Sequence, residues 1–258
     1  AYARGVVAID LNADLGESYG VWRLGEDEAM LDIVTSANIA CGFHAGDPST
    51  LRRVCVAAVE RHVTIGAHVS YPDLAGFGRR FIDIDPGDLR DAVLYQLGAL
   101  DAFAQVAGAG VKYLKPHGAL YHACSTHPAQ AEAVVAAAVE FDPSMALLGA
   151  PGSHLLNLAD GAGIEAVAEG FADRAYRGDG SLVPRSEPGS VHTDTPTIVA
   201  QAVTIATERT VTSTDGEQVA VEARSLCVHG DTPGAVEHAR EIRHALADHE
   251  VGVYAFAL

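Results

Sequence analysis

Lysine is scarce in this sequence of 258 residues, in which only Lys112 and Lys115 occur and 17 basic residues stand against 34 acidic ones. The resulting formal net charge of −17 repels polyanions, so we expect neither nucleic acid nor an anionic membrane as a partner. The same field does not steer anions toward the protein. An anionic ligand would therefore need a local cationic pocket.

Paired cysteines and long apolar runs are also missing. The four cysteines lie far apart in apolar or helical contexts and form no CxxC pair, so we expect free, buried thiols in a reducing compartment. No apolar run reaches membrane-spanning length, and the first residues contain no secretory hydrophobic region. These observations predict a cytoplasmic protein.

Several catalytic motifs are absent as well. The sequence has no GxxxxGK[ST] loop, which excludes nucleotide binding by a P-loop. It has no HExxH or HxH pair, so the ligands of any metal ion would have to come from separate strands.

Strand-like and helix-like segments alternate along the whole chain without a linker. We expect seven strands, at 6–13, around 39–41, and at 63–69, 111–114, 145–149, 164–169 and 224–228. We expect helices at 26–34, 49–62, 128–141, 152–158 and 197–208, and two more that begin at residues 86 and 233. This order predicts a parallel sheet, and at this length a closed or nearly closed β/α barrel. We expect one domain over 1–258, with a long loop at about 172–197 and a β-hairpin at about 211–222.

Histidines follow four of the expected inner strands, and the stretch SANIACGFHAGDP at 36–48 is the first example. They are His44, His68, His117 and His229. Because the carboxyl ends of the strands in a parallel barrel open on one face, we expect these side chains to converge there. A single histidine after a strand is more often structural, but four in the same context favour a functional site.

Carboxylates accompany these histidines at the strand ends. They are Asp14, Glu17, Asp47, Asp73, Glu169, Asp173 and Asp231. Each has an alternative interpretation: Asp47 before Pro48 is as suitable for a helix cap as for catalysis, Asp14 could also cap a helix, and Glu17 could be solvated.

Cationic side chains lie near the same predicted rim. Lys115 at a strand end could hold an anion or neutralise a developing oxyanion, or it could form an ordinary ion pair with Asp14 or Glu169. Arg79 and Arg80, in a loop with Gly76 and Gly78, and Arg174 could clamp an anionic ligand. Arg185 is more simply interpreted as a surface residue.

A metal site is a competing hypothesis for the same rim. Asp14, His44 and His68, with His117 as a further ligand, could supply nitrogen and oxygen ligands and leave a position open for water. The residue spacing does not favour this alternative over a metal-free site.

Seven motifs resemble the LamB/YcsF family. They are DLNADLGE (10–17), SANIACGFHAGDP (36–48), IGAHVSYPDLAGFGRR (65–80), KPHGALY (115–121), EGFADRAY (169–176), LVPR (182–185) and HGDTP (229–233). They occur in order over nearly the whole chain. The family usually has proline where Val69 stands and asparagine where His122 stands, which puts in question only those two positions.

The resemblance implies a distorted seven-stranded parallel β/α barrel, related to glycoside hydrolases and polysaccharide deacetylases. It also implies an ATP-dependent 5-oxoprolinase, which converts 5-oxo-L-proline to L-glutamate with ATP and Mg²⁺ and works only with partner subunits B and C. A homo-oligomer is a further expectation. The competing hypotheses are a metal-dependent deacetylase or amidohydrolase and a non-catalytic ligand-binding subunit.

Under this hypothesis the residues divide into two groups. We assign catalytic roles to Asp14, Glu17, His44, His68, Lys115, His117, Glu169 and His229. We assign substrate binding to Asn12, Asp47, Tyr71, Arg79, Arg80, Asp173, Arg174 and Asp231. Lys115 with Arg79 or Arg80 would balance carboxylate and phosphate charge, a carboxylate would act as general base, and a histidine would orient water or donate a proton.

Overall fold

A computed structural model describes the chain over residues 7–228 and 234–257. Its main sheet consists of β1 (Ala8–Leu15), β2 (Ser36–Ala40), β3 (Thr64–Val69), β4 (Tyr113–Pro116), β5 (Ala146–Gly149), β6 (Glu165–Phe171) and β9 (Ser225–Val228). Each strand pairs in parallel with the next, and β9 pairs with β1, so these seven strands of the described chain close into a barrel. The expected seven-stranded parallel β/α barrel is confirmed.

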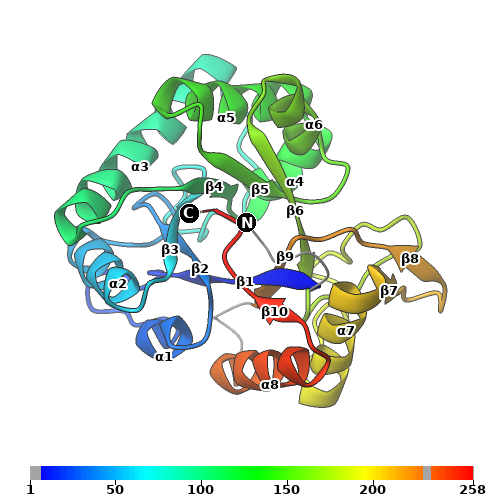
Figure 1. Cartoon of the computed structure of the whole chain (residues 1–258). Coiled ribbons are helices and arrows are strands. Elements are labelled where there is room, and N and C mark those ends of the chain that lie inside the picture. The colour runs from blue at the N-terminus through cyan, green and yellow to red at the C-terminus, as the bar shows by residue number, and fades with distance from the viewer. Residues whose placement is uncertain (1–6, 229–233, 258) are drawn as a thin grey trace.

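Helices surround the strands on the outside of the barrel (Figure 1). They are α1 (Asp27–Leu31), α2 (Pro48–Glu60), α3 (Pro86–Ala107), α4 (Gly118–Thr126), α5 (Pro128–Phe141), α6 (His154–Gly161), α7 (Thr195–Glu208) and α8 (Ala235–Asp248). The sequence did not predict α4, which begins directly after β4. None of the described helices is both long and apolar enough to cross a membrane.

Three further strands lie outside the barrel wall. β10 (Gly252–Val253) pairs in parallel with the first residues of β1, whereas β7 (Thr210–Thr212) and β8 (Gln218–Ala220) form an antiparallel pair after α7. Between β6 and α7 the chain is held by two isolated bridges, Arg174 to Val191 and Tyr176 to Leu182.

The helix ends follow simple rules of capping. Asp47 is the N-cap of α2, where its carboxylate accepts hydrogen bonds from the backbone amides of Ser49 at 2.9 Å and Thr50 at 3.2 Å, and Pro48 occupies the first turn. Asp85 and Pro86 begin α3 in the same way, and Gly108 ends it in the left-handed conformation.

One end of the barrel interior is filled by side chains. Tyr113 is fully buried with Ala146, Leu148 and Val167, and Phe256 packs against this group, its ring 4.8 Å from that of Tyr113. Gly66 on the neighbouring strand makes room for Tyr113, because a Cβ atom there would overlap the tyrosine ring. The other end of the barrel, at the carboxyl ends of the strands, is therefore where a cavity can form.

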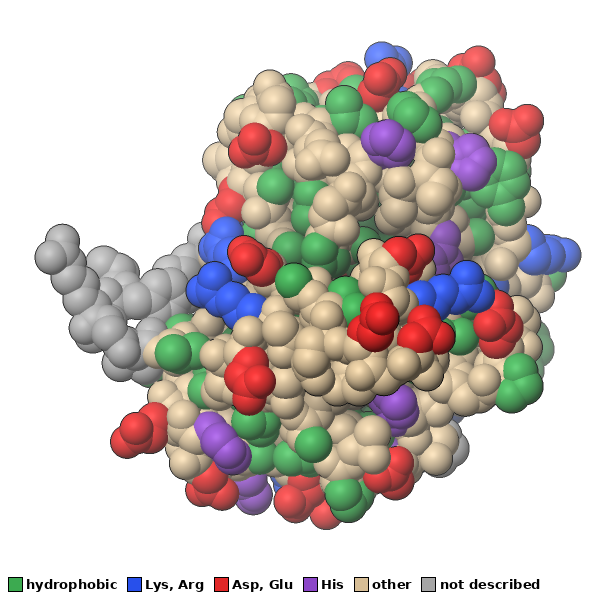
Figure 2. Space-filling view, turned by 90° about the vertical axis from the view of Figure 1, so that its right-hand side faces the viewer, with side chains coloured by type: hydrophobic (Ala, Val, Ile, Leu, Met, Phe, Trp, Pro, Cys, Tyr) green, Lys and Arg blue, Asp and Glu red, His purple; other side chains and the backbone are tan. Residues whose placement is uncertain are grey.

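The acidic side chains are spread out on the face of the molecule that Figure 2 shows. In the view of Figure 2 they are dispersed among fewer lysine and arginine side chains and do not gather into one patch. An anionic ligand therefore has to be attracted by groups inside a cavity.

Candidate active site

A cavity of about 690 Å³ opens at the carboxyl ends of the barrel strands. Its lining includes Asp14 from β1, His68 from β3 and Lys115 from β4, together with Arg79 and Phe171. Side chains that are remote in the sequence thus share one rim, as expected for a parallel barrel.

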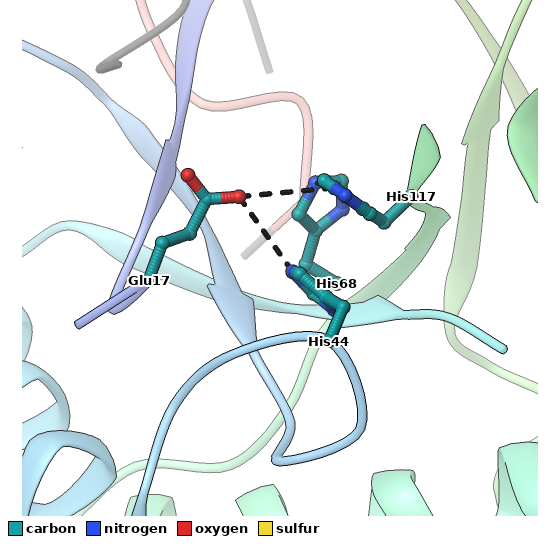
Figure 3. Close-up of side chains that lie close together, drawn as sticks. All are labelled: Glu17, His44, His68 and His117. Carbon is teal, nitrogen blue, oxygen red and sulfur yellow. Dashed lines mark hydrogen bonds and ion pairs between the residues drawn. The ribbon is translucent and has the colours of Figure 1, made fainter. Parts of the chain in front are cut away.

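Four side chains form a compact group at this rim, which we call the Glu/His cluster: Glu17, His44, His68 and His117. Glu17 follows β1, His44 lies in the loop after β2, His68 is in β3 and His117 follows β4, and the four side chains point toward one another (Figure 3). One nitrogen or oxygen atom from each lies within 4.8 Å of the others, and all four residues are buried. Three of the four predicted histidines therefore converge, and His229 lies outside the described residues.

Hydrogen bonds to backbone carbonyls fix two of these imidazoles. Nδ1 of His68 lies 3.2 Å from the carbonyl oxygen of Lys115, and Nε2 of His117 lies 2.8 Å from that of Phe77. The inner nitrogens of the two rings, Nε2 of His68 and Nδ1 of His117, are 3.0 Å apart.

His44 is held differently from the other two histidines. Its ring stacks on that of His117, with centroids 3.8 Å apart and planes 9° from parallel. Neither of its ring nitrogens has a hydrogen-bond partner among the described residues, and the nearest carboxylate oxygen, of Glu17, is 3.6 Å from Nε2. Burial, followed by the neighbouring His117, holds the pKa of His44 well below its usual range, and burial with His68 does the same for the pKa of His117.

Lys115 lies beside the Glu/His cluster, and its ammonium group is surrounded by polar side-chain atoms. Its Nζ is 3.0 Å from Glu169 Oε2, 3.2 Å from Asp14 Oδ1 and 3.2 Å from Cys227 Sγ. Burial acts to lower the pKa of Lys115, but Asp14, Cys227 and Glu169 outweigh it and hold that pKa well above its usual value. Lys115 is therefore a buried ammonium group that both forms the ion pairs and lines the cavity.

A hydrogen-bonded layer inside the barrel supports Asp14 and Lys115. The amide of Asn38 donates to Asp14 Oδ1 at 2.8 Å and to Asn12 Oδ1 at 2.7 Å, and Tyr113 donates to Asn38 Oδ1 at 2.7 Å. Asn12 in turn donates to Ser225 Oγ at 2.6 Å. Asn12 is fully buried and outside the cavity lining, so the structure gives this predicted binding residue a positioning role.

Three arginines line the cavity. Arg79 lies with its guanidinium 5.0 Å from the ring centroid of Phe77, and Arg174 is buried, with Nε donating to the Ser190 carbonyl at 3.1 Å. Arg185, interpreted from the sequence as a surface residue, also lines the cavity. This supplies the local positive charge that the acidic chain otherwise lacks.

Other predicted binding residues lie outside the cavity lining. Arg80 pairs with Asp73, Tyr71 is fully buried with its hydroxyl on Gln130, and Asp47 caps α2. Asp173 is buried but does not line the cavity, and Asp231 lies outside the described residues.

The structure adds site residues that the spacing did not reveal. Asn38 and Cys227 contact Asp14 and Lys115 from within apolar strands, where the sequence offers no distinguishing signal. Tyr121 and His122 line the cavity from α4. Burial and the nearby Glu169 raise the pKa of Tyr121 well above its usual value.

The donor set of the Glu/His cluster, three imidazoles and one carboxylate, is of the kind that holds zinc and other divalent transition metals. It shares His44, His68 and the further ligand His117 with the set expected from the sequence, but Glu17 takes the place of Asp14. Asp14 lies 3.3 Å from Nε2 of His68 and also pairs with Lys115.

Comparisons with known proteins agree over nearly the full length. A protein of Nocardia farcinica, named as the A subunit of 5-oxoprolinase, is 58% identical over 248 residues, covering 96% of this chain and 99% of that protein. A crystal structure of a protein named Lactam Utilization Protein, from Thermus thermophilus, superposes with a TM-score of 0.92 at 42% identity, covering 96% of this chain and all of that one.

A more distant likeness concerns the fold alone. A family 4 carbohydrate esterase from Streptomyces lividans has a TM-score of 0.52 at 11% identity, over 97% of this chain and 93% of that one.

The model of the LamB/YcsF family matches residues 9–257. With this match and the 58% identical relative, the chain belongs to the LamB/YcsF family.

Proposed function

We propose that the chain is the A component of an ATP-dependent 5-oxoprolinase, which together with the B and C subunits converts 5-oxo-L-proline, ATP and water into L-glutamate, ADP and phosphate. The observation that carries this proposal is the 58% identity with the corresponding 5-oxoprolinase component of Nocardia farcinica, over nearly the whole of both chains. A cytoplasmic location is part of the proposal, since all four cysteines are unpaired.

The chemistry of the substrate explains why such a site needs both cations and a base. An unstrained lactam resists hydrolysis because its amide is resonance-stabilised. Phosphorylation of the lactam oxygen by ATP would make the ring carbon electrophilic. Attack by one water and cleavage of the C–N bond would give the acyl phosphate of glutamate, which a second water would hydrolyse to glutamate and phosphate. The site must therefore neutralise negative charge, take a proton from water and return one to the leaving nitrogen.

Asp14 and Lys115 are placed to carry the central steps. Both line the cavity, and the ammonium of Lys115 is 3.2 Å from Asp14 Oδ1. In our proposal Asp14 takes the proton from water and returns it to the ring nitrogen as the C–N bond breaks, while Lys115 stabilises charge on the oxygen bound to the reacting carbon. Glu169, fully buried at 3.0 Å from Lys115 Nζ, positions the ammonium.

Arg79 and Arg174 both line the cavity and would bind the carboxylate of 5-oxoproline. Arg79 could make a bidentate contact, whereas Arg174 already donates to the carbonyls of Ser190 and Val183 and would contribute its remaining N–H groups. The Glu/His cluster lies beside Asp14, with His68 Nε2 at 3.3 Å from its carboxylate, and would orient the attacking water.

The decisive experiment is glutamate production from 5-oxoproline by the purified chain, with and without ATP and with and without the B and C subunits. We expect glutamate only in the complete mixture. Complete mixtures that yield no glutamate, although the chain is folded, would refute the proposal.

The Glu/His cluster also favours a second candidate, a metal-dependent amidohydrolase. That enzyme would release glutamate or another amide product without ATP and would lose activity in a chelator, so the same assay separates the two. A chain that only binds ligand would bind 5-oxoproline but would tolerate Asp14→Asn in the assembled complex.

A further inference from the structure

We propose that Glu17, His44, His68 and His117 bind one divalent transition-metal ion, with zinc as the first candidate. The ligand atoms would be a carboxylate oxygen of Glu17, Nε2 of His68, Nδ1 of His117 and one ring nitrogen of His44. The inference rests on the geometry of the cluster and does not depend on which substrate the cavity takes.

The first argument is the contact between the inner nitrogens of His68 and His117. A neutral imidazole carries a single N–H, and the outer nitrogen of each ring lies within hydrogen-bond distance of a carbonyl oxygen, 3.2 Å for His68 and 2.8 Å for His117. Each ring therefore donates outward and has a bare lone pair on its inner nitrogen. These two lone pairs face each other at 3.0 Å, and Asp14 Oδ2 lies 3.3 Å from the same nitrogen of His68, so both contacts are repulsive unless a cation lies among these atoms.

The second argument separates a metal ion from a shared proton. A proton bridges two atoms, but four donors converge here within 4.8 Å. Oxygen Oε1 of Glu17 is 3.6 Å from Nε2 of His44 and 3.7 Å from Nδ1 of His117, which is too long for a hydrogen bond. Ligand atoms that each lie about 2.1 Å from one zinc ion are spaced by roughly 3 to 4 Å, which matches these separations.

His44 supplies the third argument. It is 1% exposed, and neither ring nitrogen has a hydrogen-bond partner among the described residues, which is unusual for a buried imidazole. Its ring is parallel to that of His117, whereas an imidazole ligates a metal in its own plane, so one of the two rings has to turn on binding. Because His117 is held by the Phe77 carbonyl, His44 is the ring that turns.

The supporting groups have the arrangement usual around metal sites. Metal-bound histidines commonly donate their second N–H to a carbonyl, which fixes the ring orientation, and the carbonyls of Lys115 and Phe77 do this for His68 and His117. Bound there, such an ion acts as a Lewis acid at the edge of the cavity.

The test uses the whole chain, without substrate or partner subunits. The protein is stripped with a chelator, dialysed, and loaded with zinc or with cobalt. We expect one ion per chain by elemental analysis, visible absorption bands from the cobalt form, and a rise in Tm of roughly 5 to 10 °C when free metal exceeds Kd about a hundredfold.

Variants identify the ligands. The imidazole of His44 makes no hydrogen bond to the described residues, so the His44→Gln variant should fold normally. Because it lacks one of the four ligands, this variant should bind the metal at least about 100-fold more weakly than the wild type. His117→Gln should have the same effect on binding. The matched control is His122→Gln, in the same cavity but outside the cluster, which should bind as the wild type does.

Two results would overturn the inference. The first is a wild-type protein that takes up no stoichiometric zinc or cobalt and shows no change in Tm, which would leave a shared proton as the bridging cation. The second is equal metal binding by wild type and His44→Gln, which would place the ion elsewhere. Because these measurements involve no turnover, a failure of the proposed 5-oxoprolinase activity would not produce either result.

Discussion

Lys115 is buried against two carboxylates, so replacing it should have two separable effects. We expect Lys115→Met to lower the turnover of the assembled complex by at least about 100-fold, because the developing oxyanion loses its cation. It should also lower the free energy of unfolding by roughly 3 to 5 kcal/mol, because the fully buried carboxylate of Glu169 loses its ion-pair partner. Steady-state kinetics and urea unfolding measure the two effects.

A double variant tells them apart. Lys115→Met combined with Glu169→Gln removes the fully buried carboxylate together with its cation, so most of the lost stability should return while turnover stays low. Recovery of turnover in the double variant would mean that Lys115 acts only on stability.

Asp10, a carboxyl group buried inside the barrel, makes the free energy of unfolding depend on pH. Its carboxylate accepts hydrogen bonds from the hydroxyls of Thr35, Ser36 and Ser225, but burial dominates and raises its pKa from 3.8 to about 6. Between these two values the folded protein retains a proton that the unfolded chain releases. The contribution of Asp10 therefore favours folding at low pH and is lost as the pH rises from about 4 to about 6.

We expect Asp10→Asn to remove this dependence. The difference in unfolding free energy between variant and wild type should change by roughly 3 kcal/mol from pH 4 to pH 7, in favour of the variant at the higher pH. Urea unfolding at a series of pH values measures it, and parallel curves for the two proteins would contradict the assigned pKa.

At the scale of elements, the backbone of the loop after β3 packs closely against the Glu/His cluster, and the contact is made at Gly78. This residue has a φ of +64°, and a Cβ there would overlap Ser70 Oγ and would lie 2.8 Å from His117 Cδ2 and 3.0 Å from His44 Cβ. We expect Gly78→Ala to lower the free energy of unfolding by about 3 kcal/mol, from backbone strain and overpacking together, and to weaken metal binding. Chemical unfolding and cobalt titration are the measurements.

Gly20 is the matched control for the backbone strain alone. It has a φ of +58°, and no atom lies within 4 Å of the position that a Cβ would take, so Gly20→Ala should cost only about 1 kcal/mol. Equal losses in the two alanine variants would show that the packing around Gly78, against Ser70, His44 and His117, contributes nothing.

The sequence was a good guide to the elements with strong local signals. β3 and α5 were predicted to within one residue because β3 is a mostly apolar run, as is usual for a buried parallel strand, and because Pro128 marks the first turn of its helix. Helix α4 was missed because its start at Gly118 has no side-chain cap and directly follows the polar residues at the end of β4. β10, with two residues, is too short for any periodicity.

Within the candidate site, the sequence identified the residue types but not their orientations. It placed His44, His68 and His117 at one rim, but Arg79 and Arg80 are adjacent, and only the backbone around Phe77, with its φ of +53°, decides which one faces the cavity. Likewise Gly16, with a φ of +70°, turns the chain so that Glu17 joins the Glu/His cluster. Such dihedral angles depend on tertiary packing and leave no periodic signal.

At the scale of the whole molecule, the net charge of −17 opposes the entry of an anionic substrate, so the arginines that line the cavity have to counter it locally. We expect Arg79→Gln to raise the KM for 5-oxoproline about tenfold or more with a smaller effect on kcat. Arg90→Gln, which removes an exposed arginine paired with Asp91, is the control and should leave both constants unchanged. An unchanged KM for Arg79→Gln would remove it from substrate binding.

The packing of Tyr113 and Phe256 inside the barrel also affects how substrate enters the cavity and how product leaves it. Because these side chains fill that end of the barrel, the cavity lies at the opposite end, at the carboxyl ends of the strands. If substrate enters and product leaves at this end of the barrel, glutamate and phosphate would compete there with the next substrate molecule. A partner subunit bound over this end would then have to move away to admit substrate and release product, and that movement could set the rate of the complete cycle.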